Sequence, residues 1–213
     1  MSVTAVVVAG GRGVRFGGLK QFATLGDETV AAVSVRQARS VANVVVLVVP
    51  PGYEGSGEGA DVVVEGGPTR AASVRAGLHH VRDAEVVVVH DAARPLAAPS
   101  LFVAVVDAVL GGADAAIPGL TITDTVKRVE RDGEITVVRS TEIREELVTV
   151  QTPQAFRRHV LVAAHESGGD ATDDAALVER FGGRVVVVLG HADNVKITVP
   201  EDLSRVARGG EFA

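Results

Sequence analysis

A glycine-rich loop carries a concentration of positive charge just after the first apolar run of the chain. The segment "AGGRGVRFGGLKQ" (9–21) has five glycines at positions 10–18, together with Arg12, Arg15 and Lys20. Glycine lets backbone N–H groups approach an anion closely, and the three cations add charge over the same place. The chain has only three lysines. The ammonium group of a lysine is compact and can contact a single phosphate oxygen. The loop therefore predicts a phosphate-binding site.

The loop does not match two well-known phosphate-binding motifs. A dinucleotide fingerprint starting at Gly11 would need glycine at the position of Phe16. Gly13 and Gly18 have the spacing of a Walker loop, but no Ser or Thr follows Lys20. A mobile surface loop with solvated charges is the alternative interpretation. At the carboxyl end of a first parallel strand, an anion site is the better prediction.

A histidine and an aspartate stand where another apolar run ends. The segment "VVVVHDAARP" (86–95) places His90 and Asp91 at the edge where open α/β sheets bind ligands. We expect Asp91 to hold Mg²⁺ or a ribose hydroxyl. The alternative is a structural role, in which Asp91 caps the next segment or pairs with Arg94. We expect His90 to be structural rather than catalytic.

A lysine and an aspartate lie close together near the end of the sequence. "ADNVKITVPED" (192–202) contains Asp193 and Lys196. If the segment is a strand, Lys196 alternates with apolar neighbours and is costly unless it reaches a cleft or a partner. An edge-strand lysine that prevents aggregation is the alternative. Because the chain has no cysteine, a hard cation bound by oxygen is the plausible metal, and Asp193 joins Asp91 as a predicted Mg²⁺ ligand.

Two threonines precede segments that resemble helix starts. "QTPQAF" (151–156) places Thr152 before a proline at a predicted first helical position, and "ATDDAALVE" (171–179) places Thr172 before two aspartates. Capping explains both threonines. Either hydroxyl also has the chemistry to face a ligand pocket.

Strands and helices are expected to alternate along most of the chain. Short valine-rich runs bounded by Gly, Pro or polar residues indicate strands that are buried on both faces. These runs lie at 3–9, 43–49, 61–66, 85–91 and 184–190. Helix-like segments lie at 28–40, 69–81, 100–110, 155–166 and 172–182, and a last helix begins at Pro200. We expect Thr69 and Ser100 to cap two of these helices. The alternation predicts right-handed βαβ units and a parallel sheet.

One segment breaks this alternation. Residues from about 119 to 150 alternate at period two around Asp132 and Gly133, which predicts a β-hairpin with a tight turn. The parent sheet has no need of two further strands. The hairpin therefore either extends an edge of the sheet or projects as an arm that another subunit covers.

Composition limits the class of protein. The 213 residues include 46% hydrophobic residues, which favours a single domain over residues 1–213 with a sizeable core. The net charge of −6 argues against nucleic acid or an anionic membrane as partner. The N-terminus lacks a basic region, and no run approaches the ~20 apolar residues of a membrane span. We expect a cytoplasmic protein.

Seven segments taken together resemble a known family. They are "GGRGVRF" with "KQ", "GGPTRAASV", "HDAARP", "DTVKR", "QTPQAF", "TDDAALVE" and "ADNVKIT". In this order and at these spacings they resemble the 2-C-methyl-D-erythritol 4-phosphate cytidylyltransferases over nearly the whole chain. The resemblance implies an α/β Rossmann-like nucleotidyltransferase fold with a mostly parallel central sheet and helices on both faces. It also implies a hairpin arm, at about 119–150, through which two chains form a homodimer.

The resemblance implies a reaction. Enzymes of this family transfer CMP from CTP to 2-C-methyl-D-erythritol 4-phosphate, with Mg²⁺, and release pyrophosphate. The product, 4-diphosphocytidyl-2-C-methyl-D-erythritol, is used in isoprenoid precursor synthesis. A cytidylyltransferase for ribitol 5-phosphate or another polyol phosphate is an alternative, because it shares most of these motifs. A nucleotide-binding module without turnover is a more distant one.

The resemblance also implies residue roles. Arg15 and Lys20 would stabilise charge at the α-phosphate of CTP. Arg144 and Lys196 would position the phosphate of the acceptor, and we expect Arg144 to do so in the partner's site. The implied substrate-binding residues are Ala9, Gly10, Gly11, Gly67, Ser73, Asp91, Ala92, Thr125, Thr152 and Thr172.

Overall fold

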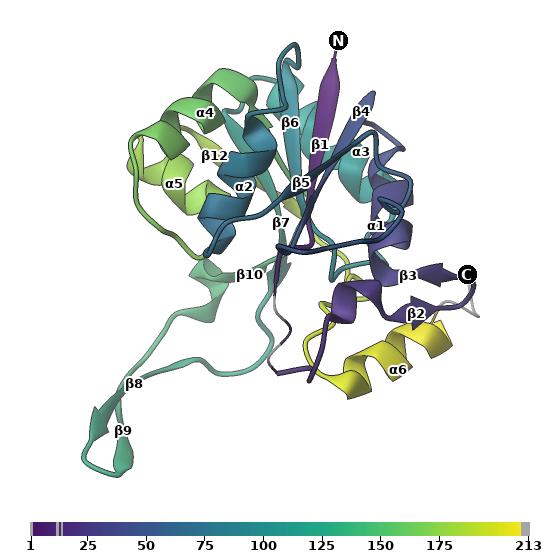
Figure 1. Ribbon diagram of the computed structural model, residues 1–213. Coiled ribbons are helices and arrows are strands. Elements are labelled where there is room, and N and C mark those ends of the chain that lie inside the picture. The colour runs from purple at the N-terminus through teal and green to yellow at the C-terminus, as the bar shows by residue number, and fades with distance from the viewer. Residues whose placement is uncertain (1, 12, 14, 210–213) are drawn as a thin grey trace.

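An eight-stranded mixed sheet forms the centre of the computed structural model, which describes residues 2–11, 13 and 15–209 (Figure 1). Its strands are β1 (Val3–Val8), β4 (Val44–Val49), β5 (Val62–Glu65), β6 (Val86–Asp91), β7 (Ala115–Thr121), β10 (Val148–Val150), β11 (Gln154–Arg157) and β12 (Val185–Leu189). The order is β10-β7-β11-β6-β1-β4-β5, with β12 beside β7. Only β10 and β11 run antiparallel to their neighbours. The predicted mostly parallel α/β sheet is confirmed.

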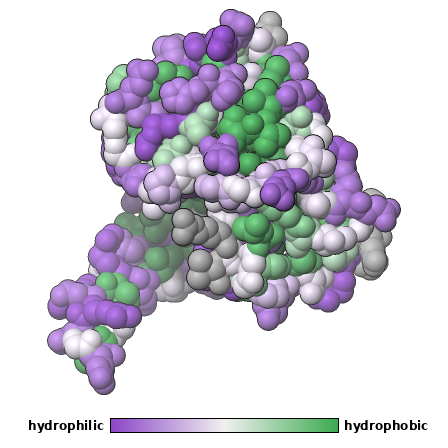
Figure 2. Space-filling view, in the orientation of Figure 1, coloured by the Kyte–Doolittle hydropathy of each residue, from purple (hydrophilic) through white to green (hydrophobic). Residues whose placement is uncertain are grey.

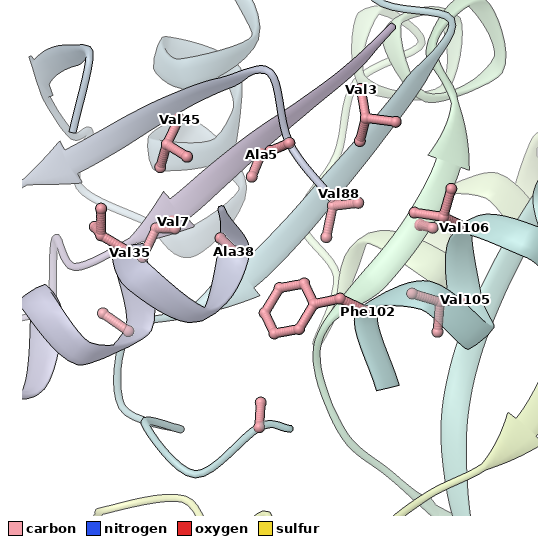
Figure 3. Packing of buried hydrophobic residues seen from close by; sticks show 14 of the residues in the cluster. Val3, Ala5, Val7, Val35, Ala38, Val45, Val88, Phe102, Val105 and Val106 are labelled. Atoms are coloured by element: carbon pink, nitrogen blue, oxygen red, sulfur yellow. The ribbon is translucent and has the colours of Figure 1, made fainter. Parts of the chain in front are cut away.

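Side chains of the inner strands are buried alternately on the two faces of the sheet. On one face, Val3, Ala5 and Val7 pack with Phe102 (Figure 3). On the other face, Val6 belongs to a second buried cluster. The first cluster lies under α1 (Val30–Ala38) and α3 (Pro99–Leu110), and the second under α2 (Arg70–Leu78), α4 (Arg158–Glu166) and α5 (Asp174–Arg180). Burial on both faces explains why these strands are apolar throughout.

One of the predicted helix caps is confirmed and others are wrong. The hydroxyl of Thr69 accepts the expected backbone hydrogen bond at the start of α2. Ser100 is not a cap, because α3 begins one residue earlier at Pro99, whose fixed φ and missing N–H suit a first helical position. Thr172 is not a cap either, because Asp173 accepts the bond at the start of α5.

The segment after Thr152 is a strand where we predicted a helix start. Gln154–Arg157 forms β11, and the helix begins only at Arg158. The reason is tertiary: β11 lies between β6 and β7, where Ala155 pairs with both strands. It satisfies backbone groups that these two strands would otherwise leave unpaired, and this gain overrides the helical pattern. Thr152 therefore does not cap a helix, and its hydroxyl can take part in the site.

The predicted hairpin projects from the body of the molecule (Figure 1). Strands β8 (Lys127–Asp132) and β9 (Ile135–Thr141) pair with each other and form a separate two-stranded sheet. Gly133 has a φ of 62°, which suits the tight turn. The arm is shorter than the predicted 119–150, because residues 119–121 and 148–150 pair as β7 and β10 within the central sheet.

The last part of the chain returns to the sheet as an extended segment and a helix. No strand forms over residues 192–198, so the lysine in this segment is not on an edge strand. The backbone N–H of Ile197 donates to the carbonyl of Ala93 at 2.8 Å, and helix α6 (Pro200–Gly209) follows. Ile197 is fully buried with Val30 and Val206. Within residues 2–11, 13 and 15–209, no helix is long and apolar enough to cross a bilayer.

Short elements complete the fold. They are the strands β2 (Thr24–Leu25) and β3 (Glu28–Thr29) and the 3₁₀ turns η1 (Lys20–Phe22) and η2 (Arg144–Glu146).

Candidate active site

A cavity of about 590 Å³ opens at the carboxyl ends of β1 and β6. The chain builds outward from β1 to β4 and β5, then returns to the other side of β1 with β6. Ligands of open α/β sheets bind at such a switch point. Four cations and one carboxylate line the cavity among the described residues, namely Arg15, Lys20, Arg70, Lys196 and Asp91. This excess of positive charge suits an anionic ligand.

Two contacts fix described residues of the glycine-rich segment after β1. Gly13 has a φ of 61°, and a Cβ atom there would lie 1.7 Å from the carbonyl oxygen of Gly18. The buried side chain of Gln21 spans the loop, since its Nε2 donates to the carbonyls of Ala9 at 2.6 Å and Gly11 at 2.9 Å. Gln21 therefore ties the start of this segment, at Ala9 and Gly11, to the residues that follow it.

Lys20 is fixed at the floor of this cavity. Its Nζ donates to the carbonyl oxygen of Ile197 at 2.5 Å. Burial lowers the pKa of Lys20, and the nearby charges of Lys196 and Arg15 lower it further. Such lowering is expected where like charges converge in a partly buried place. Arg12, which we also predicted to contribute charge, lies outside the described residues.

Asp91 lies between two cations. Its Oδ2 is 2.6 Å from Nζ of Lys196, and its Oδ1 is 3.4 Å from Nε of Arg70. Burial alone would raise the pKa of Asp91, but Arg70 and Lys196 hold it well below its usual range. Arg94, the partner we considered from sequence, instead donates to the carbonyl of Asn194. Asp91 is therefore ionised. Lys196 reaches the cleft, in agreement with the first of the two interpretations that we gave for it from sequence.

A buried hydrogen-bond network supports Asp91 from behind. The backbone N–H of Asp91 donates to Oγ1 of Thr152 at 3.0 Å, and this hydroxyl lies 3.1 Å from Nδ1 of His90. The other ring nitrogen lies 3.2 Å from the carbonyl of Arg94. A carbonyl only accepts, so we assign the proton to Nε2 and the donated hydroxyl proton to Nδ1. Burial lowers the pKa of His90 to about 4, which agrees with a neutral, structural ring.

A second cavity of about 410 Å³ adjoins the first. Arg70, Asp91 and Lys196 line both cavities and so form their common wall. The second cavity is also lined by Arg94, Gln151, Thr152, Gln154, Thr172 and Asp173, among others. Two ligands bound side by side would meet at the three shared residues.

The structure brings most of the predicted site residues together. The first cavity is lined by Ala9, Gly10, Gly11, Arg15, Lys20, Gly67, Ser73, Asp91 and Lys196. The second contains Thr152 and Thr172. Ala92 lies just behind the site, fully buried, and its carbonyl accepts from Ser34.

Three predicted site residues lie elsewhere in the chain. Thr125 and Arg144 are exposed on the arm side of the molecule and line neither cavity. A guanidinium N–H of Arg144 donates to the carbonyl of Thr123. The side chain of Asp193 is 82% exposed and 3.6 Å from His191, so the structure does not bring it to Asp91.

Sequence reasoning missed Arg70 and Gln21. Arg70 is the first residue of α2, where the positive end of the helix disfavours a cation. An arginine at an unfavourable helix position indicates a role outside the helix, and this signal can be read from the sequence. For Gln21 we find no comparable signal, because its two acceptors become its neighbours only when the glycine loop closes.

The donor set fits a divalent cation that is held mainly by ligand phosphates. Within the described part of the chain, no three His, Cys, Asp or Glu side chains are grouped closely enough to hold a metal ion. Asp91 is the single carboxylate among the described residues of the first cavity. Mg²⁺ is commonly bound by one or two carboxylates together with substrate phosphates. Asp91 suits that arrangement.

The fold and the site define a nucleotide-binding α/β protein of the group-transfer type. A glycine loop lies at the switch point of the sheet, and Arg70, Asp91 and Lys196 form a wall that two cavities share. The chain belongs to the 2-C-methyl-D-erythritol 4-phosphate cytidylyltransferase family, whose profile matches residues 3–208. Members of this family are nucleotidyltransferases, and the resemblance noted from sequence is confirmed.

Curated relatives and a solved structure agree with this assignment. The chain is 44% identical over 210 residues to the 2-C-methyl-D-erythritol 4-phosphate cytidylyltransferase of Rhodococcus jostii, covering 94% of this chain and 92% of that protein. It is 43% identical over 217 residues to the bifunctional enzyme IspD/IspF of Anaeromyxobacter sp., covering 95% of this chain but 56% of that protein's length. The crystal structure of the Thermus thermophilus cytidylyltransferase superposes with a TM-score of 0.83 at 35% identity, covering 99% of this chain and 100% of that one.

Proposed function

We propose that the chain transfers CMP from CTP to 2-C-methyl-D-erythritol 4-phosphate, giving 4-diphosphocytidyl-2-C-methyl-D-erythritol and pyrophosphate. The observation that carries the proposal is the common wall of Arg70, Asp91 and Lys196 between two cavities. A transfer between two anionic substrates needs two adjoining sites and positive charge where they meet. Family membership supplies the identity of the two substrates.

In the proposed reaction, a phosphate oxygen of the acceptor attacks the α-phosphorus of CTP. A new P–O bond forms, the bond between the α- and β-phosphates breaks, and pyrophosphate leaves with the electron pair. No general base is needed, because the attacking phosphate is already ionised at pH 7. The chain's contribution is therefore positioning and fixed positive charge, as in other phosphoryl transfers.

The first cavity suits the nucleotide. Gly10, Gly11 and Gly13 line this cavity, and Lys20 and Arg15 would supply charge where it builds on the α-phosphate and the leaving group. Lys20 is anchored by a single carbonyl, so its ammonium keeps two further protons for phosphate oxygens.

The second cavity suits the acceptor. Lys196 lies on the shared wall, where it can meet the acceptor's phosphate. Gln151 and Thr172 present polar groups that suit polyol hydroxyls, and this polar lining favours such a substrate over an apolar one. The relatives favour methylerythritol phosphate over ribitol 5-phosphate as that polyol.

We infer that Mg²⁺ takes part, held by Asp91 and by the phosphates of CTP. When bound, the ion neutralises charge on the phosphates. Asp91 keeps its negative charge through Arg70 and Lys196, so an oxygen ligand is ready without loss of a proton. The proposed reaction belongs in the cytoplasm, where its nucleotide substrate is found.

We also propose that two chains pair through the arm. Four large apolar side chains of the arm are more than half exposed, namely Val129 (53%), Ile135 (63%), Val138 (56%) and Ile143 (61%). Figure 2 shows small hydrophobic patches on the projecting arm, which is otherwise mostly hydrophilic. A second copy of the chain would cover them. Arg144, next to Ile143, would then enter the partner's second cavity and bind the acceptor phosphate through its planar fork.

A pyrophosphate-release screen tests the proposed reaction. The chain is assayed with Mg²⁺ and each of CTP, UTP, ATP and GTP, against methylerythritol phosphate and ribitol 5-phosphate separately. We expect release with CTP and methylerythritol phosphate. Preference for ribitol 5-phosphate would identify the other polyol enzyme. CTP binding without release for any acceptor would identify a module without turnover and overturn the proposal.

A further inference from the structure

Five ionisable side chains form a continuous chain of contacts that runs from the site into the helical layer. Nζ of Lys196 lies 2.6 Å from Asp91, whose second oxygen lies 3.4 Å from Nε of Arg70. Nη1 of Arg70 then lies 2.6 Å from Oδ2 of Asp174. Oδ1 of Asp174 lies 3.0 Å from Nε2 of His165. The proposed reaction uses the first three of these residues and gives no task to the last two.

Asp174 and His165 are buried beneath the site. Their side chains are 1% and 2% exposed, and neither lines either cavity. They therefore make no contact with a ligand in these cavities. Arg70, in contrast, lines both cavities. The side chain of Asp174 reaches the two cavities through its ion pair with Arg70.

The orientation of Arg70 depends on two carboxylates. Its Nε faces Asp91 and its Nη1 faces Asp174, while Nη2 is buried with no hydrogen-bond partner among the described residues. Burial alone would lower the pKa of Arg70, but the charges of Asp174 and Asp91 raise it above its ordinary value. Two carboxylates on two edges of a planar guanidinium fix both its position and its plane.

The helix ends explain why Asp174 is needed. Arg70 begins α2, where the partial positive charge of the helix end disfavours it. Asp174 begins α5, where a carboxylate is favoured, and thus brings a stable negative charge to Arg70. Nδ1 of His165 is buried without a partner within the described residues. A neutral imidazole that donates through Nε2 leaves no unpaired donor there, so we assign that tautomer.

We propose that Asp174 and His165 are positioning residues: Asp174 fixes the guanidinium of Arg70 on the wall between the two cavities, and His165 fixes the carboxylate of Asp174. Without Asp174, both edges of the guanidinium are free to turn toward Asp91, which draws that carboxylate away from Lys196. The expected loss is in the transfer step, because the glycine loop that binds the nucleotide makes no contact with Asp174. The activity measurements rest on the proposed function.

The first test is Asp174→Asn, which keeps the shape and removes the charge. We expect kcat to fall about 10- to 100-fold, because a displacement of roughly 1 Å at a reacting centre costs that much. The dissociation constant of CTP, measured by calorimetry without acceptor, should change less than about twofold. Asp61→Asn is the matched control, because Asp61 pairs with Arg39 at 2.7 Å and lines neither cavity. An unchanged kcat in folded Asp174→Asn overturns the inference.

The second test separates positioning from packing. His165→Gln keeps an N–H donor toward Asp174, whereas His165→Leu keeps bulk and removes the donor. We expect His165→Gln to retain kcat within about threefold and His165→Leu to lose about tenfold. Equal kcat values in the two variants overturn the proposed role of His165. This comparison also decides the question if Asp174→Asn does not fold.

A third measurement does not depend on activity. The Nη–H signals of Arg70, assigned by NMR with an Arg70→Lys variant, should exchange slowly with solvent in the wild-type chain and at least about tenfold faster in Asp174→Asn, because Nη1 donates to Asp174. Fast exchange in the wild-type chain overturns the inference. A wild-type chain that releases no pyrophosphate overturns the proposed function instead, and the exchange rates still decide the positioning of Arg70.

Discussion

Lys20 and Ile197 are 177 residues apart in sequence, and the ammonium of the first donates to the backbone carbonyl of the second. This contact fixes the distance from the Lys20 backbone to its charged atom. The two remaining N–H bonds of the ammonium stay available for a ligand in the first cavity, which Lys20 lines. A longer, planar side chain with its charge spread over three nitrogens does not reproduce that geometry.

Lys20→Arg should therefore lower kcat for pyrophosphate release by about 100-fold or more, comparable to the loss of one preorganised donor. The charge is kept, so the change tests geometry rather than electrostatics alone. Arg36→Lys serves as control, since Arg36 is an exposed residue of α1 that pairs with Glu28. Near-normal turnover in Lys20→Arg would contradict the proposed role of Lys20.

Metal removal tests the role of Asp91. Excess EDTA should abolish pyrophosphate release, and added Mg²⁺ should restore it, because the phosphates of CTP need a hard cation. Asp91→Asn should raise the Mg²⁺ concentration for half-maximal activity and lower kcat by about 100-fold. Asp193→Asn should change neither quantity more than about twofold, because its side chain is 82% exposed and away from the cavities. Full activity in EDTA would rule out the metal.

Arg144→Ala tests the proposed arm interface. Loss of a charged hydrogen bond to phosphate should cost about 2–3 kcal/mol in kcat/KM for the polyol phosphate. This corresponds to roughly 30- to 150-fold. The dissociation constant of CTP should be nearly unchanged, because Arg144 lines neither cavity of its own chain.

A mixing experiment decides whether Arg144 acts across the interface. Arg144→Ala chains are combined with Lys20→Ala chains, each of which has strongly reduced activity alone. If Arg144 serves the partner, a mixed dimer has one intact site and one site with both defects, so activity returns toward half. If Arg144 serves its own chain, every site keeps one defect and no activity returns. Light scattering that shows only monomers at assay concentration also contradicts the prediction.

Tyr53 gives a direct test of electrostatics beside the anion loop. It is the only tyrosine, its ring stacks on Phe22 at 4.5 Å, and its hydroxyl donates to Glu58 at 2.6 Å. Burial raises the pKa of Tyr53 to about 12, and Glu58 adds to the effect. A raised pKa means that tyrosinate forms later as pH increases. Absorbance at 295 nm should therefore show a midpoint near pH 12 rather than 10 while the chain is folded.

Glu58→Gln should shift this midpoint toward 10, because it removes the negative charge that opposes ionisation. Glu54→Gln, in the same loop but without the hydrogen bond, should leave it in place. Circular dichroism at each pH shows whether the chain is still folded. A midpoint at 10 in a folded wild-type chain contradicts the structure around Tyr53.

The sequence predicts the positions of the functional groups better than their partners. Lys20 and Asp91 follow buried strands, and the rule that parallel strands end at one edge is enough to place them together. Arg70 and Asp174 are 104 residues apart and begin two different helices. No local pattern states that those two helix ends lie side by side, because that depends on how the second helical layer packs.

The strand β11 shows a second limit. Residues from 155 to 166 have a helical pattern, and the helix does form from Arg158 onward. The first residues become a strand only because β6 and β7 leave a place between them. Backbone pairing across the sheet decides the outcome, and side-chain periodicity does not report it. The consequence for the site is large, since the strand brings Thr152 against Asp91 instead of onto a helix.

The contact between Lys20 and Ile197 also bears on protein synthesis. The anion loop leaves the ribosome before its anchoring carbonyl and Lys196, which emerge only after the arm and the helices α1 to α5 have been made. Until then, Lys20 lacks its acceptor and Asp91 lacks one of its two cations. A nascent chain therefore holds an incomplete nucleotide site until Ile197 has been made. Nucleotide that binds the finished site would in turn stabilise the late segment, so ligand and C-terminal folding are linked.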